Sequence, residues 1–572
     1  MAGKPQTVPL SGFSDQNGWL HCDEIKLSEL HQQLMTSGVF PASPAFVYSR
    51  RRLEENVQQY QKALHVLPVP SSLYYSMKAN HNLQILNILR SMGCGLTLVS
   101  GGELQIALAL GFEASRLLLN GSGKVRWEVE AAVRADVLLN VDSEFDLQQT
   151  VDVCRQLGRP ARALLRLNLD IDPKVHKYVS TGQAGSKFGL DPAALARVVG
   201  VLTSGDCPVH VEGLHCHLGS TIRDADVLRE SVRRLLTIRQ ELTSQGLHGL
   251  RMINIGGGLN IDYTRQQDET KPYRVEEEEC RHDLTRLAED LGRAAADEPE
   301  ERRQLCLSAL DMVQDYCKER ISRATLDCQV MDVLNQLWPN GALQDTFAAL
   351  LMKKQGVPTP KELIESIAGL FESPRDDDVT IIVEPGRTIV GDAAVFLTTV
   401  LGRKSSGSKN FLVVDGAMTD VVRPSLYGAY HHIHPAAPPS SKHAQPLTST
   451  ADPPSGLGDA SHEAGRDTSR SSGQGEGRGQ SDLQVVDVVG PVCESGDFLG
   501  KDRLLPLLSP GACVVVRDVG AYCASMASNY NVRMRPVEVM VDGTSWRVIR
   551  RPDTVADVMR PYQVDTDVIT SD

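Results

Sequence analysis

Short apolar runs alternate with helical patterns through the first two thirds of the chain. Runs of about four to six residues, such as those at 73–77, 96–99 and 211–216, read as strands. Stretches such as 50–67 and 82–92 carry apolar residues at helical spacing instead. The strand-and-helix unit recurs roughly eight times before Glu384, about every 25–35 residues. This repeat predicts an α/β fold, a (β/α)8 barrel of the alanine-racemase type, over residues 46–386.

The pattern changes after Arg387. Apolar runs at 395–400, 411–414, 483–489, 512–516 and 537–541 are separated by turns and loops rather than helices. They predict an all-β C-terminal domain, a barrel or a sandwich, over residues 387–572. Residues 1–45, with one expected helix near 26–37, form an N-terminal segment that partly joins this β domain.

Two segments interrupt these regularities. Residues 264–358 are charged and helical in pattern, and they are too long for a connection within a barrel unit. We expect a helical insertion here, either a partner surface or a solvated decoration without function. Residues 435–482 are rich in Ser, Gly, Pro and Asp, so we expect a disordered loop. Deleting residues 436–481 should therefore leave activity nearly intact.

Composition narrows the functional classes. The 572 residues are 41% hydrophobic and 23% charged, with a formal net charge of −13, which is ordinary for a globular protein and argues against nucleic-acid binding. No apolar stretch is long enough for a transmembrane helix, so we expect no membrane partner. The N-terminus has no signal core, which favours the cytoplasm, or a plastid if a leader is missing. The 12 cysteines contain no Cys-x-x-Cys pair, so we expect reduced packing thiols and no metal site.

Lys78 stands at the carboxyl end of the strand at 73–77, where an α/β barrel places its chemistry. A lysine in an apolar wall loses proton affinity, and its free amine can then attack carbonyl groups. The alternative is a lysine that reaches the solvent past a strand end.

Polar motifs close other strands. The stretch at 215–220 places two histidines and a serine after a strand, with no carboxylate near them in the sequence for a metal site. Glycines at 256–258 could cradle a phosphate or form a simple tight turn. Glu384 and Arg387 follow the strand at 381–383, and Arg suits phosphate or carboxylate groups, although the two could form a structural pair. We expect the motifs at 490–497 and 520–522 in the β domain. Taken singly, each favours a packing role, as a buried thiol at Cys493 and a packing aromatic at Tyr522.

Taken in order, these motifs resemble the fold-III pyridoxal-phosphate-dependent decarboxylases, and within them the diaminopimelate decarboxylases of plant and algal type. The resemblance runs from about residue 18 to 559, apart from the two insertions. Further matching stretches lie at 172–176, 180–182, 186–189, 423–427 and 525–531.

The resemblance implies pyridoxal 5'-phosphate as cofactor and a catalytic pair. Lys78 would bond covalently to the cofactor aldehyde, and Cys493 would protonate the carbon that loses the carboxylate. Glu384 would pair with the ring nitrogen, and His217 would stack on the ring. The cofactor-binding residues would be Lys78, His217, Ser220, Gly258, Glu384, Pro385, Gly386, Arg387 and Tyr522. The substrate-binding residues would be Arg387, Arg423, Tyr427, Glu494 and Tyr522.

The family also implies a small-molecule substrate and a homodimer with shared active sites, since a second subunit supplies Cys493 and Glu494. The substrate would be meso-2,6-diaminopimelate, converted to L-lysine and CO2, because Arg423 suits a far carboxylate. The alternatives are an ornithine-, lysine- or arginine-type decarboxylase of the same fold, or an inactive regulatory homologue. Two positions depart from the family: Thr97 stands where Asp is frequent, and Val519 stands where a small residue is usual.

Overall fold

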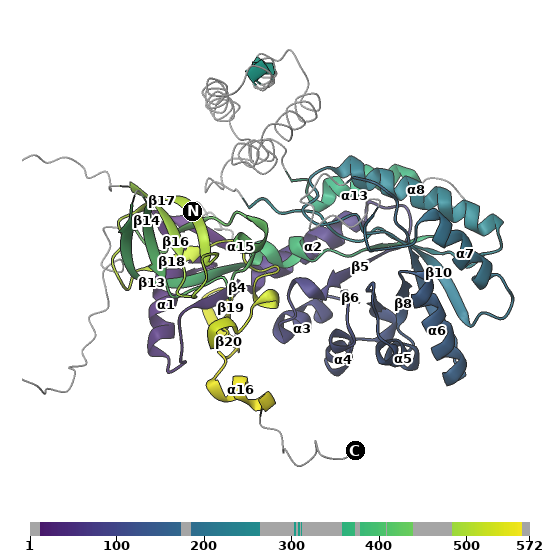
Figure 1. Cartoon of the computed structure of the whole chain (residues 1–572), viewed down its shortest axis with the longest axis horizontal. Coiled ribbons are helices and arrows are strands. Elements are labelled where there is room, and N and C mark those ends of the chain that lie inside the picture. The colour runs from purple at the N-terminus through teal and green to yellow at the C-terminus, as the bar shows by residue number, and fades with distance from the viewer. Residues whose placement is uncertain are drawn as a thin grey trace, which may run out of the picture. The chain divides into compact units, whose positions relative to one another are not determined.

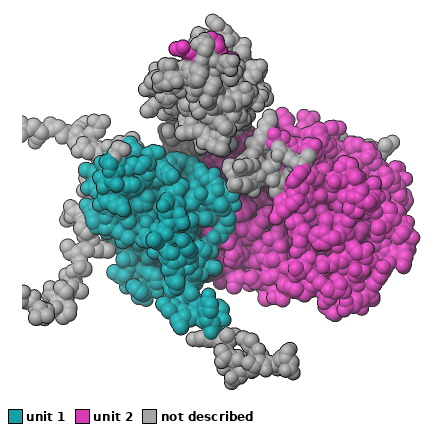
Figure 2. All heavy atoms as spheres, in the orientation of Figure 1, with its two compact units in different colours: residues 1–51, 393–519, 526–572 teal, residues 52–392, 520–525 magenta. Residues whose placement is uncertain are grey.

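The computed structural model describes residues 12–172, 185–263, 303–304, 307–308, 310–311, 357–371, 378–407, 409–438 and 483–562. The chain forms two compact units (Figure 2). Unit 1 comprises residues 1–51, 393–519 and 526–572, and unit 2 comprises residues 52–392 and 520–525. Most of the helical insertion expected at 264–358, the loop at 439–482, and the motifs at 173–176 and 180–182 lie outside the described residues. The expectations about them stay predictions.

Unit 2 contains a closed barrel of eight parallel strands, which confirms the fold expected from the repeat. The strands follow one another around the barrel in chain order, and β12 closes the ring against β5, where Ile381 lies opposite Ser71. Their bounds are β5 (Ser71–Ser76), β6 (Gly95–Leu98), β7 (Leu117–Leu119), β8 (Leu138–Val141), β9 (Ala161–Arg166), β10 (Val209–His215), β11 (Met252–Asn254) and β12 (Thr380–Val383).

The strands form because they are almost continuously apolar, as parallel strands covered on both faces must be. All three residues of β7 are buried. Strands from different sides of the barrel contribute one apolar cluster, which fills its interior: Tyr74, Leu118, Leu138, Leu164 and Ile382.

Helices lie on the outside of the strands (Figure 1). Several begin at a side chain that accepts a hydrogen bond from the first turn, as Ser100, Ser143 and Asp191 do. The helices are α2 (Arg50–Leu64), α3 (Leu83–Ser91), α4 (Gly101–Ala109), α5 (Arg126–Ala135), α6 (Glu144–Leu157), α7 (Pro192–Leu202), α8 (Ala225–Ser244), α13 (Pro360–Ala368) and α14 (Arg387–Val390). No helix in the described ranges is both long and apolar enough to cross a membrane.

Unit 1 is built mainly from strands, in agreement with the expected β domain. A three-stranded sheet contains β1 (Phe13–Gln16), β2 (Trp19–Cys22) and β3 (Ile25–Lys26). The nine strands of the larger sheet are β4 (Ala45–Ser49), β13 (Ala394–Ser406), β14 (Lys409–Val414), β15 (Ile433–Pro435), β16 (Leu483–Val489), β17 (Phe498–Pro506), β18 (Cys513–Val516), β19 (Val537–Asp542) and β20 (Ser545–Arg550). Its helices are α1 (Leu27–Thr36), α15 (Arg423–Tyr427) and α16 (Val555–Met559).

The strand at 46–48 belongs to unit 1, although we expected it at the start of the barrel domain. β4 pairs with β13 on one side and β19 on the other, and all five of its residues are buried. Leucines of α1 pack into the same core as Ala45 and Val47. The division therefore falls after Arg51 and Asp392 rather than at 45 and 386, because β4 and β13 complete this sheet.

Candidate active site

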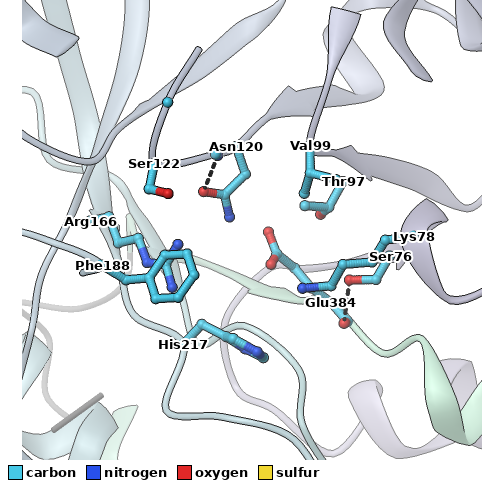
Figure 3. A pocket seen from close by; sticks show the side chains of 12 residues that line it. Ser76, Lys78, Thr97, Val99, Asn120, Ser122, Arg166, Phe188, His217 and Glu384 are labelled. Carbon is cyan, nitrogen blue, oxygen red and sulfur yellow. Dashed lines mark hydrogen bonds between the residues drawn. The ribbon is translucent and has the colours of Figure 1, made fainter. Parts of the chain in front are cut away.

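A cavity of about 330 Å³ lies at the carboxyl ends of the barrel strands (Figure 3). Functional residues of such barrels come from these ends. The cavity brings together Lys78, His217 and Glu384, which the sequence singled out. The other residues that line it are Ser76, Thr97, Val99, Asn120, Gly121, Ser122, Gly123, Arg166 and Phe188.

Lys78 lies in a short 3-10 helix, Met77–Ala79, directly after β5. Met77 and Ala79 are fully buried, but the Lys78 side chain is exposed and lines the cavity. The expectation that an apolar wall buries this amine is therefore wrong. The buried neighbours fix the backbone, and the Lys78 side chain extends into the cavity on the side where Glu384 lies (Figure 3).

Glu384 follows β12 and is 4% exposed. Asn254 Nδ2 donates to its Oε1 at 2.7 Å, and His215 Nε2 lies 3.6 Å from its Oε2. Burial alone would raise the pKa of this carboxyl, but the nearby His215 ring and the hydrogen bond from Asn254 lower it to about 2. The cavity thus holds an ionised carboxylate near neutral pH.

His215 links this carboxylate to a second buried side chain. Asn140 Nδ2 lies 2.6 Å from His215 Nδ1 and also donates to Asn120 Oδ1 at 3.0 Å. Burial lowers the pKa of His215, while Glu384 opposes that shift. The fold brings a carboxylate to the 215–217 histidines, but the described residues contain no group of three or more His, Cys, Asp or Glu placed to hold a metal.

His217 presents a neutral ring to the cavity. The backbone N–H of Gly257 donates to its Nδ1 at 3.3 Å. Burial, and next the charge of Lys78, lower the pKa of His217 well below its usual value. An uncharged imidazole held in this way can cover a flat ligand.

The loops after β10, β11 and β12 form a cradle suited to an anion. Arg387 is 5% exposed, and its Nη2 donates to Ser220 Oγ at 2.8 Å, while its Nη1 donates to the Tyr263 hydroxyl. A Cβ on Gly258, which has φ +105°, would fall 2.1 Å from the Gly219 carbonyl oxygen. A Cβ on Gly386 would fall 3.0 Å from Ala79 Cβ. Only glycine fits at Gly258, and Gly386 is tightly confined, so these loops pack closely against one another beside Arg387. Glycines in such loops leave backbone N–H groups uncovered, as a phosphate site requires.

Tyr522 belongs to unit 2, although we expected the motif at 520–522 in the β domain. Residues 520–525 form a short segment of unit 2 that is flanked in sequence by residues of unit 1. Its backbone is left-handed, with φ +58°, and its N–H donates to the Ala79 carbonyl at 2.9 Å. Its ring lies 4.9 Å from the guanidinium carbon of Arg387. Such a backbone conformation is costly for a tyrosine and marks a site where position matters.

The other predicted residues lie in unit 1. Arg423 opens α15 and is 4% exposed, and Tyr427, one turn later, is half-buried. Cys493 is an exposed free thiol, next to exposed Glu494. Ser425 Oγ donates to the Gly496 carbonyl at 2.6 Å, so α15 and the Cys493 loop are tied together.

Nine of the residues that line the cavity were not among the predicted site residues, and Asn120, Arg166, Phe188 and Thr97 are four of them. Asn254, which supports Glu384 from outside the cavity lining, was not predicted either. Arg166 closes β9, pairs with Asp142 at 3.1 Å, and lies 4.6 Å from the Phe188 ring. Asn254 closes β11, and Asn120 directly follows β7. Arg166, Asn254 and Asn120 could have been found from the sequence, because each is a polar residue at the end of a barrel strand.

Comparison with known proteins identifies relatives over nearly the whole chain. Residues 50–298 match the family model of the pyridoxal-binding domain of pyridoxal-dependent decarboxylases. The chain is 33% identical to a probable chloroplastic diaminopimelate decarboxylase of rice, over 95% of this chain and 83% of that protein. It is 31% identical to the diaminopimelate decarboxylase of Neisseria meningitidis serogroup A, over 94% and 98%. A structure of the Helicobacter pylori enzyme with L-lysine has a TM-score of 0.65 and 26% identity, over 93% and 99%.

Proposed function

The chain belongs to the diaminopimelate decarboxylase family, and we infer that it decarboxylates meso-2,6-diaminopimelate to L-lysine and CO2, with pyridoxal 5'-phosphate as cofactor. This reaction is the last step of lysine biosynthesis. The observation that carries the inference is one cavity that holds an amine, an ionised carboxylate and a neutral imidazole at barrel strand ends, beside an arginine–glycine cradle. The compartment, cytoplasm or plastid, stays a prediction.

The residues present fit the cofactor. Ser220, Gly258, Gly386 and Arg387 would hold the phosphate, because glycine leaves the backbone uncovered and Arg387 supplies a charged fork. Glu384 would hold a proton on the ring nitrogen, since its pKa of about 2 keeps it anionic. When bound, the cofactor supplies an aldehyde for amines and a ring that accepts the electron pair left by a departing carboxylate.

Lys78 would anchor the cofactor and yield its place to the substrate amine. His217 would cover one face of the ring, and Tyr522 would touch both cofactor and substrate. The contacts of Arg387 with Ser220 and Tyr263 support its cofactor role more directly than its predicted substrate role. These assignments rest on the positions of the side chains around the cavity and its cradle.

The substrate carries an amine and a carboxylate at its far end. Arg423 and Tyr427 would bind the far carboxylate, and Glu494 would bind the far amine. Cys493 would deliver a proton from its thiol to the carbon that has lost CO2, and solvent would then return a proton to the exposed thiolate. One proton thus replaces one carboxylate.

We also propose that the active site is shared between two copies of the chain. Cys493 and Glu494 are exposed on a loop of unit 1, where another molecule can reach them. A partner subunit's barrel would use this pair, as the family resemblance implies.

Release of CO2 from purified holoenzyme tests the function. We expect turnover of diaminopimelate, at most weak turnover of L-lysine or ornithine, and loss of activity in Lys78→Ala. The holoenzyme should also absorb near 420 nm, and Lys78→Ala should lose that band. Ornithine turnover equal to that of diaminopimelate would contradict the substrate assignment, and a colourless, inactive protein would favour the regulatory alternative.

A further inference from the structure

A buried histidine contacts the arginine assigned to the far carboxylate of the substrate. Arg423 Nη1 lies 2.8 Å from His431 Nε2. Both side chains are buried, Arg423 being 4% and His431 0% exposed. The other ring nitrogen, Nδ1, lies 2.8 Å from the Arg517 carbonyl oxygen.

These two contacts determine which nitrogen carries the proton. A carbonyl oxygen only accepts, so Nδ1 of His431 carries the hydrogen and donates it to Arg517. Nε2 then presents its lone pair, and the guanidinium, which has donors only, gives it a hydrogen bond. The imidazole in this arrangement is uncharged, so this contact orients Arg423 without cancelling its positive charge.

The sheet backbone fixes the ring. The Arg517 N–H donates to the His432 carbonyl at 2.8 Å, and Ile433 in β15 lies opposite Val516 in β18. The carbonyl that holds His431 is thus part of the pairing between two strands. The position of Nε2, and of the Arg423 N–H that points to it, follows from that pairing.

We propose that His431 is a positioning residue for substrate specificity. It sets the orientation in which the Arg423 guanidinium meets the far carboxylate of the substrate. Tyr427 lies four residues after Arg423 on α15 and so faces the same side. The proposal rests on the function proposed above, in which Arg423 binds that carboxylate.

Three substitutions separate the two hydrogen bonds of His431. His431→Gln places an amide oxygen near Nε2 and can still accept from Arg423. His431→Asn places its amide near Nδ1 and can keep the bond to Arg517 alone. His431→Phe fills the space and keeps neither bond. Arg423→Lys, alone and combined with His431→Phe, completes a double-mutant cycle.

The readouts are KM and kcat for diaminopimelate, and the dissociation constants of L-lysine and of 1,5-diaminopentane for the holoenzyme. L-lysine keeps the far carboxylate, whereas 1,5-diaminopentane lacks both carboxylates. We expect His431→Phe and His431→Asn to raise KM and to weaken L-lysine binding by roughly tenfold or more, the effect of losing one hydrogen bond to a charged group. The affinity for 1,5-diaminopentane should change by less than about twofold in these variants. His431→Gln should keep most of the L-lysine affinity that His431→Phe loses. The double variant should bind L-lysine only slightly more weakly than Arg423→Lys alone.

The outcomes distinguish the inference from the function on which it rests. If Arg423→Lys leaves KM and L-lysine affinity unchanged, the assigned role of Arg423 is wrong, and the inference is wrong with it. If Arg423→Lys weakens binding but His431→Asn does not, only the inference is overturned. Equal losses for L-lysine and diaminopentane, or additive effects in the cycle, would show that His431 acts through general stability. If His431→Phe does not fold, the comparison of His431→Asn with His431→Gln still tests the inference, because only the Gln variant can accept from Arg423.

Discussion

At the scale of single residues, the charge on Glu384 should be visible in stability. Its pKa is about 2 in the folded protein against 4.5 without the fold, so its contribution is complete above pH 4.5 and is lost as the pH falls towards 2. Glu384→Gln mimics the protonated form. We expect the apoprotein to be more stable than this variant at pH 7, by roughly 3 kcal/mol.

The measurement is the unfolding free energy from urea titration, between pH 7 and the lowest pH at which both proteins fold. The difference between the proteins should shrink as the pH falls below about 4.5. The matched control repeats the comparison in an Asn254→Ala background, which lacks the 2.7 Å hydrogen bond to Glu384. There, Glu384→Gln should lower the free energy of unfolding at pH 7 by less. A difference that stays constant or grows on acidification would contradict the assignment.

The sequence predicted which residues meet at the strand ends better than it predicted their surroundings: Lys78, His217 and Glu384 do line one cavity. Lys78 was expected in an apolar wall, but exposure of a side chain depends on what other strands place around it. The partnership of Glu384 with His215 and Asn254 joins residues far apart in the chain, so no local spacing encodes it. The strand-end rule would have found Arg166, Asn120 and Asn254, because only their place in the barrel singles them out.

At the scale of elements, the loop with Cys493 depends on one aspartate. Asp497 is 4% exposed, and its carboxylate accepts from the Met418 N–H at 2.6 Å and from the Val492 N–H at 2.7 Å. Asp497→Ala leaves both donors without this partner and should release the loop. We expect faster hydrogen exchange at 490–497 and a fall in kcat of tenfold or more, with unit 1 still folded.

The control for this prediction is Ser425→Ala, which removes one hydrogen bond from the same loop, to the Gly496 carbonyl. Its effect on exchange and on kcat should be smaller, since the Asp497 carboxylate still holds the loop. Unchanged exchange at 490–497 in Asp497→Ala would show that other contacts suffice to position Cys493.

The sequence predicted helices and strands well where the periodicity was strong. It predicted less well which sheet a strand joins, because that depends on pairing with distant strands. The eight barrel strands follow from apolar runs that alternate with helical stretches. The strand at 46–48 has the same apolar character as a barrel strand, but its partners β13 and β19 come from distant parts of the chain. An apolar run predicts a strand, whereas partner choice depends on tertiary packing.

At the scale of the whole molecule, a site shared between two copies can be tested by complementation. Lys78→Ala lacks the amine of the barrel, and Cys493→Ala lacks the thiol of unit 1, so each should be inactive alone. If the thiol serves a partner's cavity, a mixed dimer contains one cavity with an intact lysine and an intact cysteine. Random pairing of equal amounts should make about half of the dimers mixed, so recovered activity should approach a quarter of the original.

The mixture must be denatured and refolded together, or co-expressed, so that subunits exchange, and each variant refolded alone sets the baseline. The double variant Lys78→Ala/Cys493→Ala mixed with intact protein is the matched control, because its mixed dimers contain no cavity with both groups when the site is shared. It should therefore reduce activity to about half of that expected from the intact chains present. Complementation that never exceeds the baseline, in a mixture that light scattering shows to be dimeric, would place both groups within one chain and overturn the shared site.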